Sequence, residues 1–325
     1  FDVDFGFRGK VQFGLVIRDG AIADQSQSNG FESDNDGTGS SNTPLTAPLF
    51  SNVTFIGPRE NSATPNSLYR RAMHLRRNSR TSVYNSVFTG YPTGLHVDGS
   101  ASQGAATNND LQLENLVFAN MGVNFEQTSG ANTWTGMTSY FTAPTRANET
   151  YTSTSALGLQ TGYNSLTNPT LLPASGSILL TGASFSNSRL STDPFWTPTT
   201  FRGAFGAQDW TAGWANFNPN GTNYSVPGVV QITSDITTNT TWTKDNIYVL
   251  NGYRYIKDGA TLTIEPGTLI KGDKASKATL IVSRTGKLVA NGTACEPIVF
   301  TSNEPAGQRT YGDWGGIVML GNATI

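Results

Sequence analysis

Three segments of the chain share one pattern, and their spacing decides the fold. Residues 51–57 read SNVTFIG, residues 84–90 read YNSVFTG and residues 114–120 read ENLVFAN. Each segment places an Asn before a short apolar run that contains a Phe and ends at a turn-forming residue. The Asn positions, 52, 85 and 115, recur at an interval within the 20 to 50 residues typical of solenoid repeats. The sequence therefore predicts a stack of similar coils.

In a parallel β-helix, short strands of one coil stack on those of the next, so equivalent side chains form ladders along the axis. The expected inward stack consists of Phe55, Phe88 and Phe118. The three Asn residues are expected to form a turn ladder whose amides bond to neighbours above and below. An antiparallel sandwich also has short strands between Gly and Asn turns, but it does not require matched turn residues at a near-constant period. The sequence favours an all-β, right-handed parallel β-helix.

A second style of repeat begins at about Gly228. Residues 261–264 read TLTI, so Leu262 and Ile264 alternate with Thr, as in a strand with one buried face. Residues 265–267 read EPG and supply a turn, because Pro presets φ and Gly permits a positive φ. This block is predicted to be a second set of β-helix coils.

The composition of the chain suggests four parts. We expect β-helix coils over 1–125, an irregular loop insertion rich in Thr, Ser, Asn and Gly over 126–176, a last coil with an aromatic cap over 177–218, and a second β-helix block over 219–325. A cap is expected because the open end of a solenoid exposes a layer of core.

Overall composition excludes several classes of partner. Charged residues form 14% of the 325 residues and the formal net charge is −2, so no global attraction to nucleic acid or anionic membrane is expected. No apolar run approaches the roughly 18 residues of a membrane span. The low charge and the abundance of Gly, Ser, Thr and Asn favour an extracellular or outer cell-surface location.

Several motifs together resemble one family. They are residues 7–14 (FRGKVQFG), 29–36 (NGFESDND), 74–79 (HLRRNS), 209–214 (DWTAGW), 262–267 (LTIEPG) and 312–316 (GDWGG). With these motifs the chain resembles exported cell-surface proteins of the Bacteroidota, described as parallel β-helix or lipoprotein-like. The resemblance covers most of the chain outside residues 126–176, and it implies a fold and a surface location without an established reaction.

The order of the two blocks differs from that of the family the chain resembles. Residues 228–325 resemble the beginning of a family member, yet here they follow an ending at about Asn218. Tandem copies, a natural permutation or a junction between subunits would each explain this order. Because a β-helix cut between coils leaves unpaired strand edges, head-to-tail self-association is the predicted mode of partnership.

An acidic cluster suggests a cation site. Residues 32–37 read ESDNDG, and alternate carboxylates beside a Gly are typical of calcium loops, since calcium needs several oxygen ligands from a tight turn. An EF-hand would place Glu at position 43, which is Thr, so that motif is excluded. The candidate calcium ligands are Asp2, Asp4, Glu32, Asp34 and Asp36. The competing interpretation is a solvated turn.

A basic cluster suggests a second kind of site. Its members are Arg70, Arg71, Arg76, Arg77 and Arg80, which surround His74. Guanidinium groups bind carboxylates and sulfates well, so these residues are candidates for contact with an acidic polysaccharide. The alternative is structural, in which each Arg pairs with a carboxylate of a neighbouring coil.

The sequence contains no recognisable catalytic motif. His74 and His96 are the only two histidines, and neither lies in a nucleophile motif or in a zinc motif such as HExxH. We therefore expect no catalytic residues and no histidine zinc site.

Three functions remain open at this point. The first is a non-enzymatic surface structural protein, as a head-to-tail fibre subunit or tandem array. The second is an acidic-polysaccharide-binding or lyase-type β-helix that uses calcium, with Arg76 or Arg77 assisting proton abstraction. The third is an adhesin that binds through the loops of residues 126–176.

Overall fold

The computed structural model describes residues 1–127, 133–222 and 228–321. They form two compact units, Phe1–Trp210 and Thr211–Ile325. Every pairing between named strands in the described ranges is parallel. The expected all-β parallel β-helix is therefore confirmed, and an antiparallel sandwich is excluded. The observed unit boundary lies eight residues before the expected end at 218.

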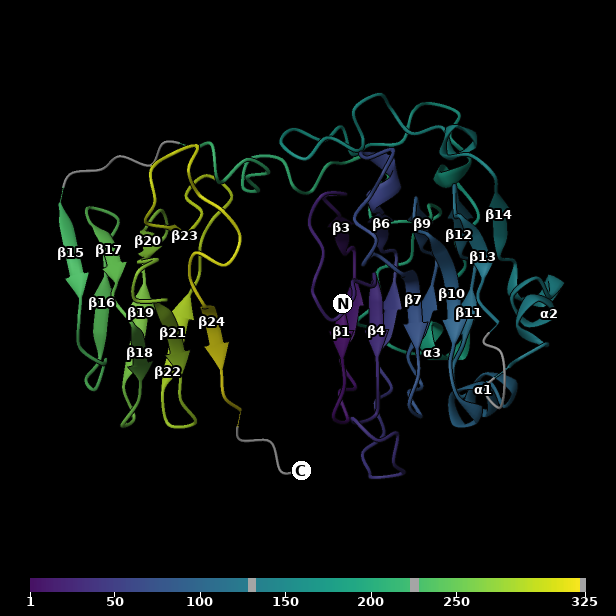
Figure 1. The fold of residues 1–325 in the computed structure, drawn as a ribbon, viewed down its shortest axis with the longest axis horizontal. Coiled ribbons are helices and arrows are strands. Elements are labelled where there is room, and N and C mark those ends of the chain that lie inside the picture. The colour runs from purple at the N-terminus through teal and green to yellow at the C-terminus, as the bar shows by residue number, and fades with distance from the viewer. Residues whose placement is uncertain (128–132, 223–227, 322–325) are drawn as a thin grey trace. The chain divides into compact units, whose positions relative to one another are not determined.

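The first unit has three parallel sheets, and successive strands pass from one sheet to the next, so that three strands make one coil (Figure 1). The first sheet contains β1 (Asp2–Val3), β4 (Phe31–Ser33), β7 (Arg71–Leu75), β10 (Thr93–Val97) and β13 (Val123–Phe125). The second contains β2 (Lys10–Gln12), β5 (Leu49–Ser51), β8 (Ser82–Tyr84) and β11 (Leu113–Glu114). The third contains β3 (Leu15–Ile17), β6 (Thr54–Ile56), β9 (Val87–Thr89), β12 (Val117–Ala119) and β14 (Glu149–Tyr151).

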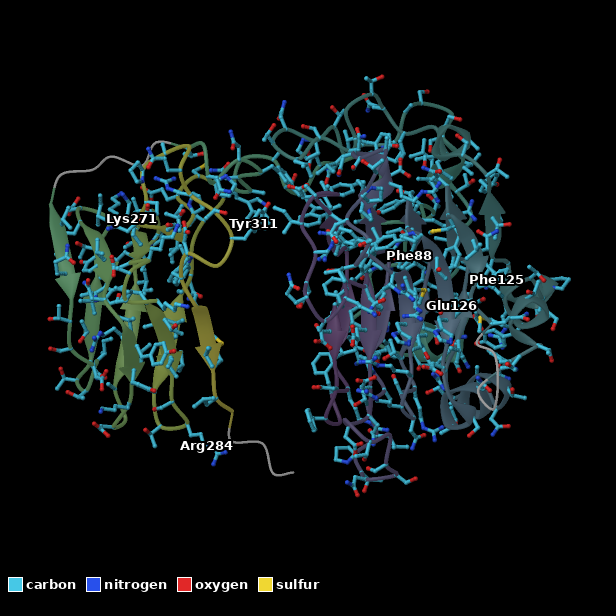
Figure 2. The ribbon with its side chains drawn as sticks, in the orientation of Figure 1. Phe88, Phe125, Glu126, Lys271, Arg284 and Tyr311 are labelled. Atoms are coloured by element: carbon cyan, nitrogen blue, oxygen red, sulfur yellow. The ribbon has the colours of Figure 1, made fainter. Side chains whose placement is uncertain are left out.

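The predicted aromatic stack forms the centre of the core in the first unit. Phe55, Phe88 and Phe118 pair in register across β6, β9 and β12, and all three are fully buried. The ring centroids of Phe55 and Phe88 lie 4.9 Å apart, and those of Phe88 and Phe118 lie 5.6 Å apart. Phe88 lies among the strands of this unit in Figure 2. The register follows from the repeat, because one slipped residue would turn each Phe outward.

The Asn ladder occupies the turn between the second and third sheets. Asn52, Asn85 and Asn115 have φ values of 55°, 51° and 57°, a left-handed conformation that Asn tolerates better than other residues with a side chain. The Asn85 amide donates to Ser51 of the preceding coil at 3.1 Å, and also to the carbonyl of Ser184 at 3.0 Å. The ladder thus binds a second segment as well as its own neighbours.

That second segment is residues 177–205, which we call the strap. The sequence predicts a last coil here, yet these residues contain no strand, only η4 (Ile178–Leu180) and α3 (Ser188–Ser191). The strap instead lies along the outside of the coils, where Asn52 donates to the carbonyl of Phe201 at 2.8 Å. Trp196 is buried against Tyr84 and Leu190, so its ring covers a side of the solenoid and not its end.

The end of the core is covered by α2 (Met137–Phe141), within the segment predicted as a loop insertion. Phe141 is fully buried, and its ring centroid lies 4.7 Å from that of Phe118 and 5.2 Å from that of Phe125. The same segment supplies β14, η2 (Pro144–Arg146) and η3 (Thr154–Leu157), while its residues 128–132 lie outside the described ranges. Residues 126–176 are therefore largely part of the packed unit. Two further short helices are α1 (Ser100–Thr107) and η1 (Pro58–Glu60).

The second unit repeats the same architecture with strands of four residues, apart from the three-residue β16 (Thr240–Trp242). Its first sheet contains β15 (Val229–Ile232), β17 (Ile247–Leu250), β20 (Leu269–Gly272) and β23 (Val299–Ser302). The second contains β16 (Thr240–Trp242), β19 (Thr261–Ile264) and β22 (Lys287–Ala290), and the third β18 (Tyr253–Ile256), β21 (Thr279–Val282) and β24 (Gly316–Met319). Leu262 and Ile264 are buried while Thr261 and Thr263 are half-buried, as the alternation in β19 predicts.

Candidate functional site

Most of the sequence-predicted site residues gather on one face of the sheet β1–β4–β7–β10–β13. Phe31, Met73 and Leu95 on these strands point into the core, so the alternate residues face away from it. Asp2, Glu32, His74 and His96 are paired in register across four coils. We call the outward row, its continuation and the Arg71 that contacts it the charged strip, which consists of Asp2, Asp4, Glu32, Asp34, Arg71, His74, Arg76, His96, Asp98 and Glu126.

The arginines of the charged strip are bound to carboxylates of other coils. Arg76 contacts Asp34 from the preceding coil through two nitrogens, at 2.7 and 3.1 Å, and also contacts Glu32. Arg71 forms a bidentate salt bridge with Glu126, at 2.6 Å for each N···O contact. Bidentate geometry is the strongest arrangement of an arginine–carboxylate pair. These contacts match the structural alternative that the sequence left open.

The other arginines of the basic cluster differ in their surroundings. Arg77 is exposed and donates to Asp34 at 2.9 Å, and Arg80 donates to Asp110 of the next coil at 2.5 Å. Arg70 is exposed. Burial raises the pKa of Glu126, but the hydrogen bond and charge of Arg71, together with the charge of Arg70, lower it overall. The cluster is therefore largely neutralised by carboxylates, and its contact with a polysaccharide stays a prediction.

The carboxylates predicted to bind calcium are only partly brought together. Asp2, Asp4, Glu32 and Asp34 lie on the charged strip, where burial and then the charges of the neighbouring carboxylates raise the pKa of Asp2 and of Asp4. Asp36 lies outside it, on a loop where its carboxylate accepts hydrogen bonds from Thr38 and Ser40.

The donor set fits calcium poorly at the predicted position, because three of its carboxylates already bind protein donors. The oxygens of Asp34 bind Arg76 and Arg77, and those of Glu32 bind Arg76 and Asn29. A calcium ion would have to displace these donors, since it needs six to eight oxygen ligands. The calcium site remains a prediction on these residues.

Two histidines and an aspartate form a tighter group in the middle of the strip. The imidazole rings of His74 and His96 are stacked, with centroids 5.1 Å apart and planes within 5° of parallel. The carboxylate of Asp98 lies beside both, with Oδ2 3.5 Å from Nε2 of His74 and Oδ1 3.9 Å from Nε2 of His96. Burial, followed by the charges of Arg71 and Arg76, lowers the pKa of His74 to about 2, so this ring is neutral at physiological pH.

Sequence reasoning missed this group. His96 and Asp98 were assigned to no site, because the two histidines are 22 positions apart and match no motif. The available signal was the repeat itself, since residues 72–76 read AMHLR and residues 94–98 read GLHVD. Aligning those two segments places His on His one coil apart, as the β7–β10 register shows.

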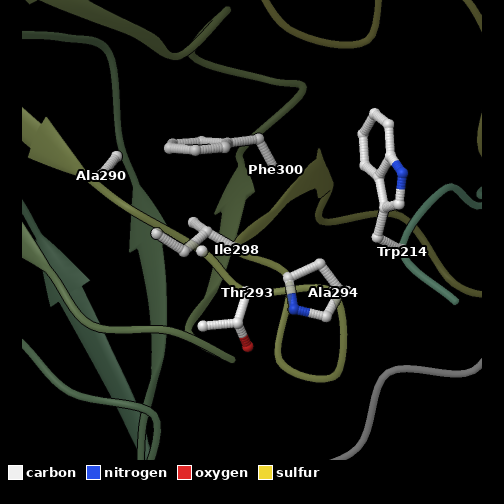
Figure 3. A pocket seen from close by; sticks show the side chains of 8 residues that line it. Trp214, Ala290, Thr293, Ala294, Ile298 and Phe300 are labelled. Carbon is white, nitrogen blue, oxygen red and sulfur yellow. The ribbon is translucent and has the colours of Figure 1, made fainter. Parts of the chain in front are cut away.

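Two cavities, one in each unit, are lined mainly by apolar residues. In the second unit a cavity of about 390 Å³ lies between Trp214 and Phe300, with Ile298 beside them (Figure 3). In the first unit a cavity of about 380 Å³ is lined by Phe13, Phe201 and Trp210. Neither cavity is lined by a charged residue. They lack the titratable groups that acid–base chemistry needs.

No helix in the described ranges combines the length and apolar character needed to cross a bilayer. Comparisons with curated proteins and with solved structures give no significant match. A family model for the pectate-lyase-like β-helix domain matches residues 1–215 and 234–325, which is nearly all of the chain. The parallel coils of both units agree with this match, and the chain belongs to the family of pectate-lyase-like β-helix domains.

Proposed function

We propose that this chain is a non-enzymatic structural β-helix of an extracellular surface protein. The observation that carries the proposal is the pairing of the strip's arginines with carboxylates of other coils, above all Arg76 with Asp34 and Glu32. Such pairs hold neighbouring coils together, and the guanidinium groups are bound to protein carboxylates. An extracellular location and the resemblance to Bacteroidota surface proteins are parts of the same proposal.

The alternative, an acidic-polysaccharide lyase, needs a group that can accept a proton from the substrate. Burial lowers the pKa of Arg76, but the hydrogen bond and charge of Asp34 and the charge of Glu32 outweigh burial and raise it above its ordinary value. His74 is a weak base, because its pKa is lowered to about 2. An efficient general base has a pKa near the working pH, so the strip favours the structural function.

An activity assay tests the proposal directly. The purified chain is incubated with a panel of acidic polysaccharides, with and without calcium, while the absorbance of unsaturated uronate products is followed. We expect no turnover on any member of the panel. Turnover that disappears in Arg76→Gln but persists in the matched variant Arg80→Gln would establish the lyase function and overturn the proposal.

Head-to-tail self-association belongs to the proposal, and the exposed apolar side chains of β24 support it. Ile317, Val318 and Met319 are 38%, 40% and 67% exposed on a strand at the edge of its sheet. Exposed apolar edge strands readily pair with further strands. Sedimentation of the full chain should show concentration-dependent assembly that Val318→Lys weakens, whereas a monomer at all concentrations would remove this part of the proposal.

Among the described residues of the 126–176 segment, no particular contact favours the adhesin alternative. Aromatic residues of the 126–176 segment that could stack on a ligand are engaged inside the unit instead. Phe141 is fully buried, Tyr140 donates to the carbonyl of Leu111 at 2.8 Å, and Tyr163 donates to Glu60. Recognition of a ligand through this segment would therefore require surfaces other than these rings.

A further inference from the structure

We propose that His74, His96 and Asp98 form a binding site for a divalent transition-metal ion such as zinc. This inference goes beyond the structural function, because it assigns a specific ligand to the centre of the charged strip. In the described ranges these residues are the one group of three His, Cys, Asp or Glu side chains whose ligand atoms all lie within 4.8 Å of one another.

The side chain of His74 provides the first argument. Its residue is only 5% exposed, yet neither Nδ1 nor Nε2 has a hydrogen-bond partner. Buried polar atoms of native proteins are nearly always satisfied, and an orphan calls for an explanation such as an ion. Nε2 of His74 already faces Oδ2 of Asp98 at 3.5 Å, too far for a hydrogen bond of ordinary geometry. A metal ion between them would bind both Nε2 of His74 and Oδ2 of Asp98.

The spacing of the ligand atoms provides the second argument. Zinc binds imidazole nitrogen at about 2.0–2.1 Å, so two ligand atoms on a tetrahedral zinc lie about 3.3 Å apart. The distances from the Asp98 oxygens to Nε2 of His74 and of His96, 3.5 and 3.9 Å, exceed this value by well under 1 Å. All ligand atoms of the group lie within 4.8 Å of one another, so side-chain rotations that tilt the two stacked rings toward each other would bring three ligands onto one ion. Oδ1 of Asp98 also lacks a hydrogen-bond partner.

The β-ladder explains why the two rings lie in this arrangement. His74 and His96 are directly paired in neighbouring parallel strands, so their side chains leave the sheet side by side and point the same way. Asp98 follows two residues after His96 and therefore emerges on the same face. Backbone pairing holds the three side chains together, which reduces the ordering that metal binding would require.

The local charge is compatible with a cation. Arg71 and Arg76 are the nearest positive groups, and each is already paired, Arg71 with Glu126 and Arg76 with Asp34. Asp98 itself adds negative charge beside both imidazole rings.

The choice of ion follows from the donor atoms. Two imidazole nitrogens and one carboxylate suit zinc, copper, nickel or iron, whereas calcium and magnesium prefer oxygen ligands alone. Three protein ligands leave a fourth position of a tetrahedral ion for water or an anionic oxygen. The side chain of Asp98 is 28% exposed, so the site can be reached from solvent.

A metal titration of the full chain, prepared without a histidine tag and stripped with a chelator, tests the proposal. The sequence makes the test clean, because His74 and His96 are the only histidines and Cys295 is the only cysteine. Calorimetry with Zn²⁺ should show one site per chain. Co²⁺ should produce visible absorption bands of a tetrahedral complex, and Ca²⁺ should not compete.

Variants then assign the ligands. His74→Gln and His96→Gln should abolish the site, and Asp98→Asn should weaken Zn²⁺ binding by at least the roughly 10–100-fold typical of lost supporting contacts in metal sites. Asp98→Asn alters a partly exposed residue, so it keeps the test informative if a histidine variant fails to fold. Cys295→Ser and Asp110→Asn are the matched controls and should bind as the wild type does.

Two results would overturn the proposal. One is a wild-type chain that binds no Zn²⁺ when the ion is titrated to excess. The other is Zn²⁺ binding that is equally tight in Asp98→Asn, in any folded histidine variant and in the Asp110→Asn control. Neither result would bear on the proposed structural function, which is tested separately by the polysaccharide assay.

Discussion

Replacing Phe141 by Ala should destabilise the first unit, although the sequence places this residue in a loop insertion. Phe141 is fully buried at the end of the core, and its ring contacts those of Phe118 and Phe125 at centroid distances of 4.7 and 5.2 Å. Phe→Ala substitutions at fully buried positions cost about 3–5 kcal/mol. We take about 4 kcal/mol as the expected loss, since α2 is held by the core and cannot easily collapse into the space.

Hydrogen exchange followed by mass spectrometry is the suitable assay, because the chain has two units and a single unfolding transition is not assured. Each 1.4 kcal/mol changes an equilibrium tenfold, so about 4 kcal/mol corresponds to roughly 10³-fold faster exchange in peptides that open with the unit. The effect should be largest in β12 and β13, the strands nearest α2, because stability in a solenoid is transmitted between neighbouring coils. Peptides of the second unit should be unchanged.

The control is Phe195→Ala, which removes the same side chain from the same unit at a position that is 48% exposed. It should change exchange little. The reasoning is refuted if Phe141→Ala and Phe195→Ala have equal effects, or if Phe141→Ala costs less than about 1 kcal/mol. Such small losses are typical of surface loops that contribute little to the stability of the core.

Three further predictions concern contacts between coils and contacts of the coils with the strap. Asn85→Ala should cost about 3 kcal/mol in denaturant unfolding of the first unit, because Ala strains the left-handed backbone and the amide hydrogen bonds are lost. Asn85→Gly should cost about half as much, because only the hydrogen bonds are lost. Equal losses would contradict the role of the backbone. Glu149→Gln should lower thermal stability at about pH 6 and reduce its loss on acidification. Burial raises the pKa of Glu149 but its bonds to Arg202 and Tyr151 lower it overall, so the wild type loses this contribution as pH falls below the ordinary value of 4.5; an unchanged pH profile would argue against it. Arg76→Gln should lower the free energy of unfolding by about 2 kcal/mol and Arg80→Gln by less, because Arg76 binds two carboxylates and Arg80 binds one that is half exposed. Chemical denaturation of the two variants measures the order, and the reverse order would contradict the prediction.

The repeat made the coils predictable from sequence. The segments around Asn52, Asn85 and Asn115 align because each coil must place a turn and an inward Phe at the same height, and the structure has both features in register. The alternation around Leu262 and Ile264 was equally informative, because a strand with one buried face has a period of two. Such signals are local, so they are visible in one stretch of sequence.

The covering segments were not predictable in the same way. The sequence predicts a loop insertion over 126–176 and a last coil with a cap over 177–218, whereas α2 covers the end of the core and the strap lies along its side. Both segments are irregular in sequence because each fits a surface made by other residues. Phe141 and Trp196 have similar apolar character, and only the location of Phe118 and of Tyr84 decides which end or side each one covers.

The sequence alone therefore determined that the chain forms stacked parallel coils, where their turns lie, and that arginines and carboxylates crowd the segments around positions 34 and 76. Only the tertiary structure decided which of these charges meet, because partners such as Arg71 and Glu126 are 55 positions apart and are joined by the stacking of coils. The same stacking places His74 beside His96 and Asp98. A ladder brings together residues one coil apart, and the length of each coil, which varies with its loops, cannot be read from a motif.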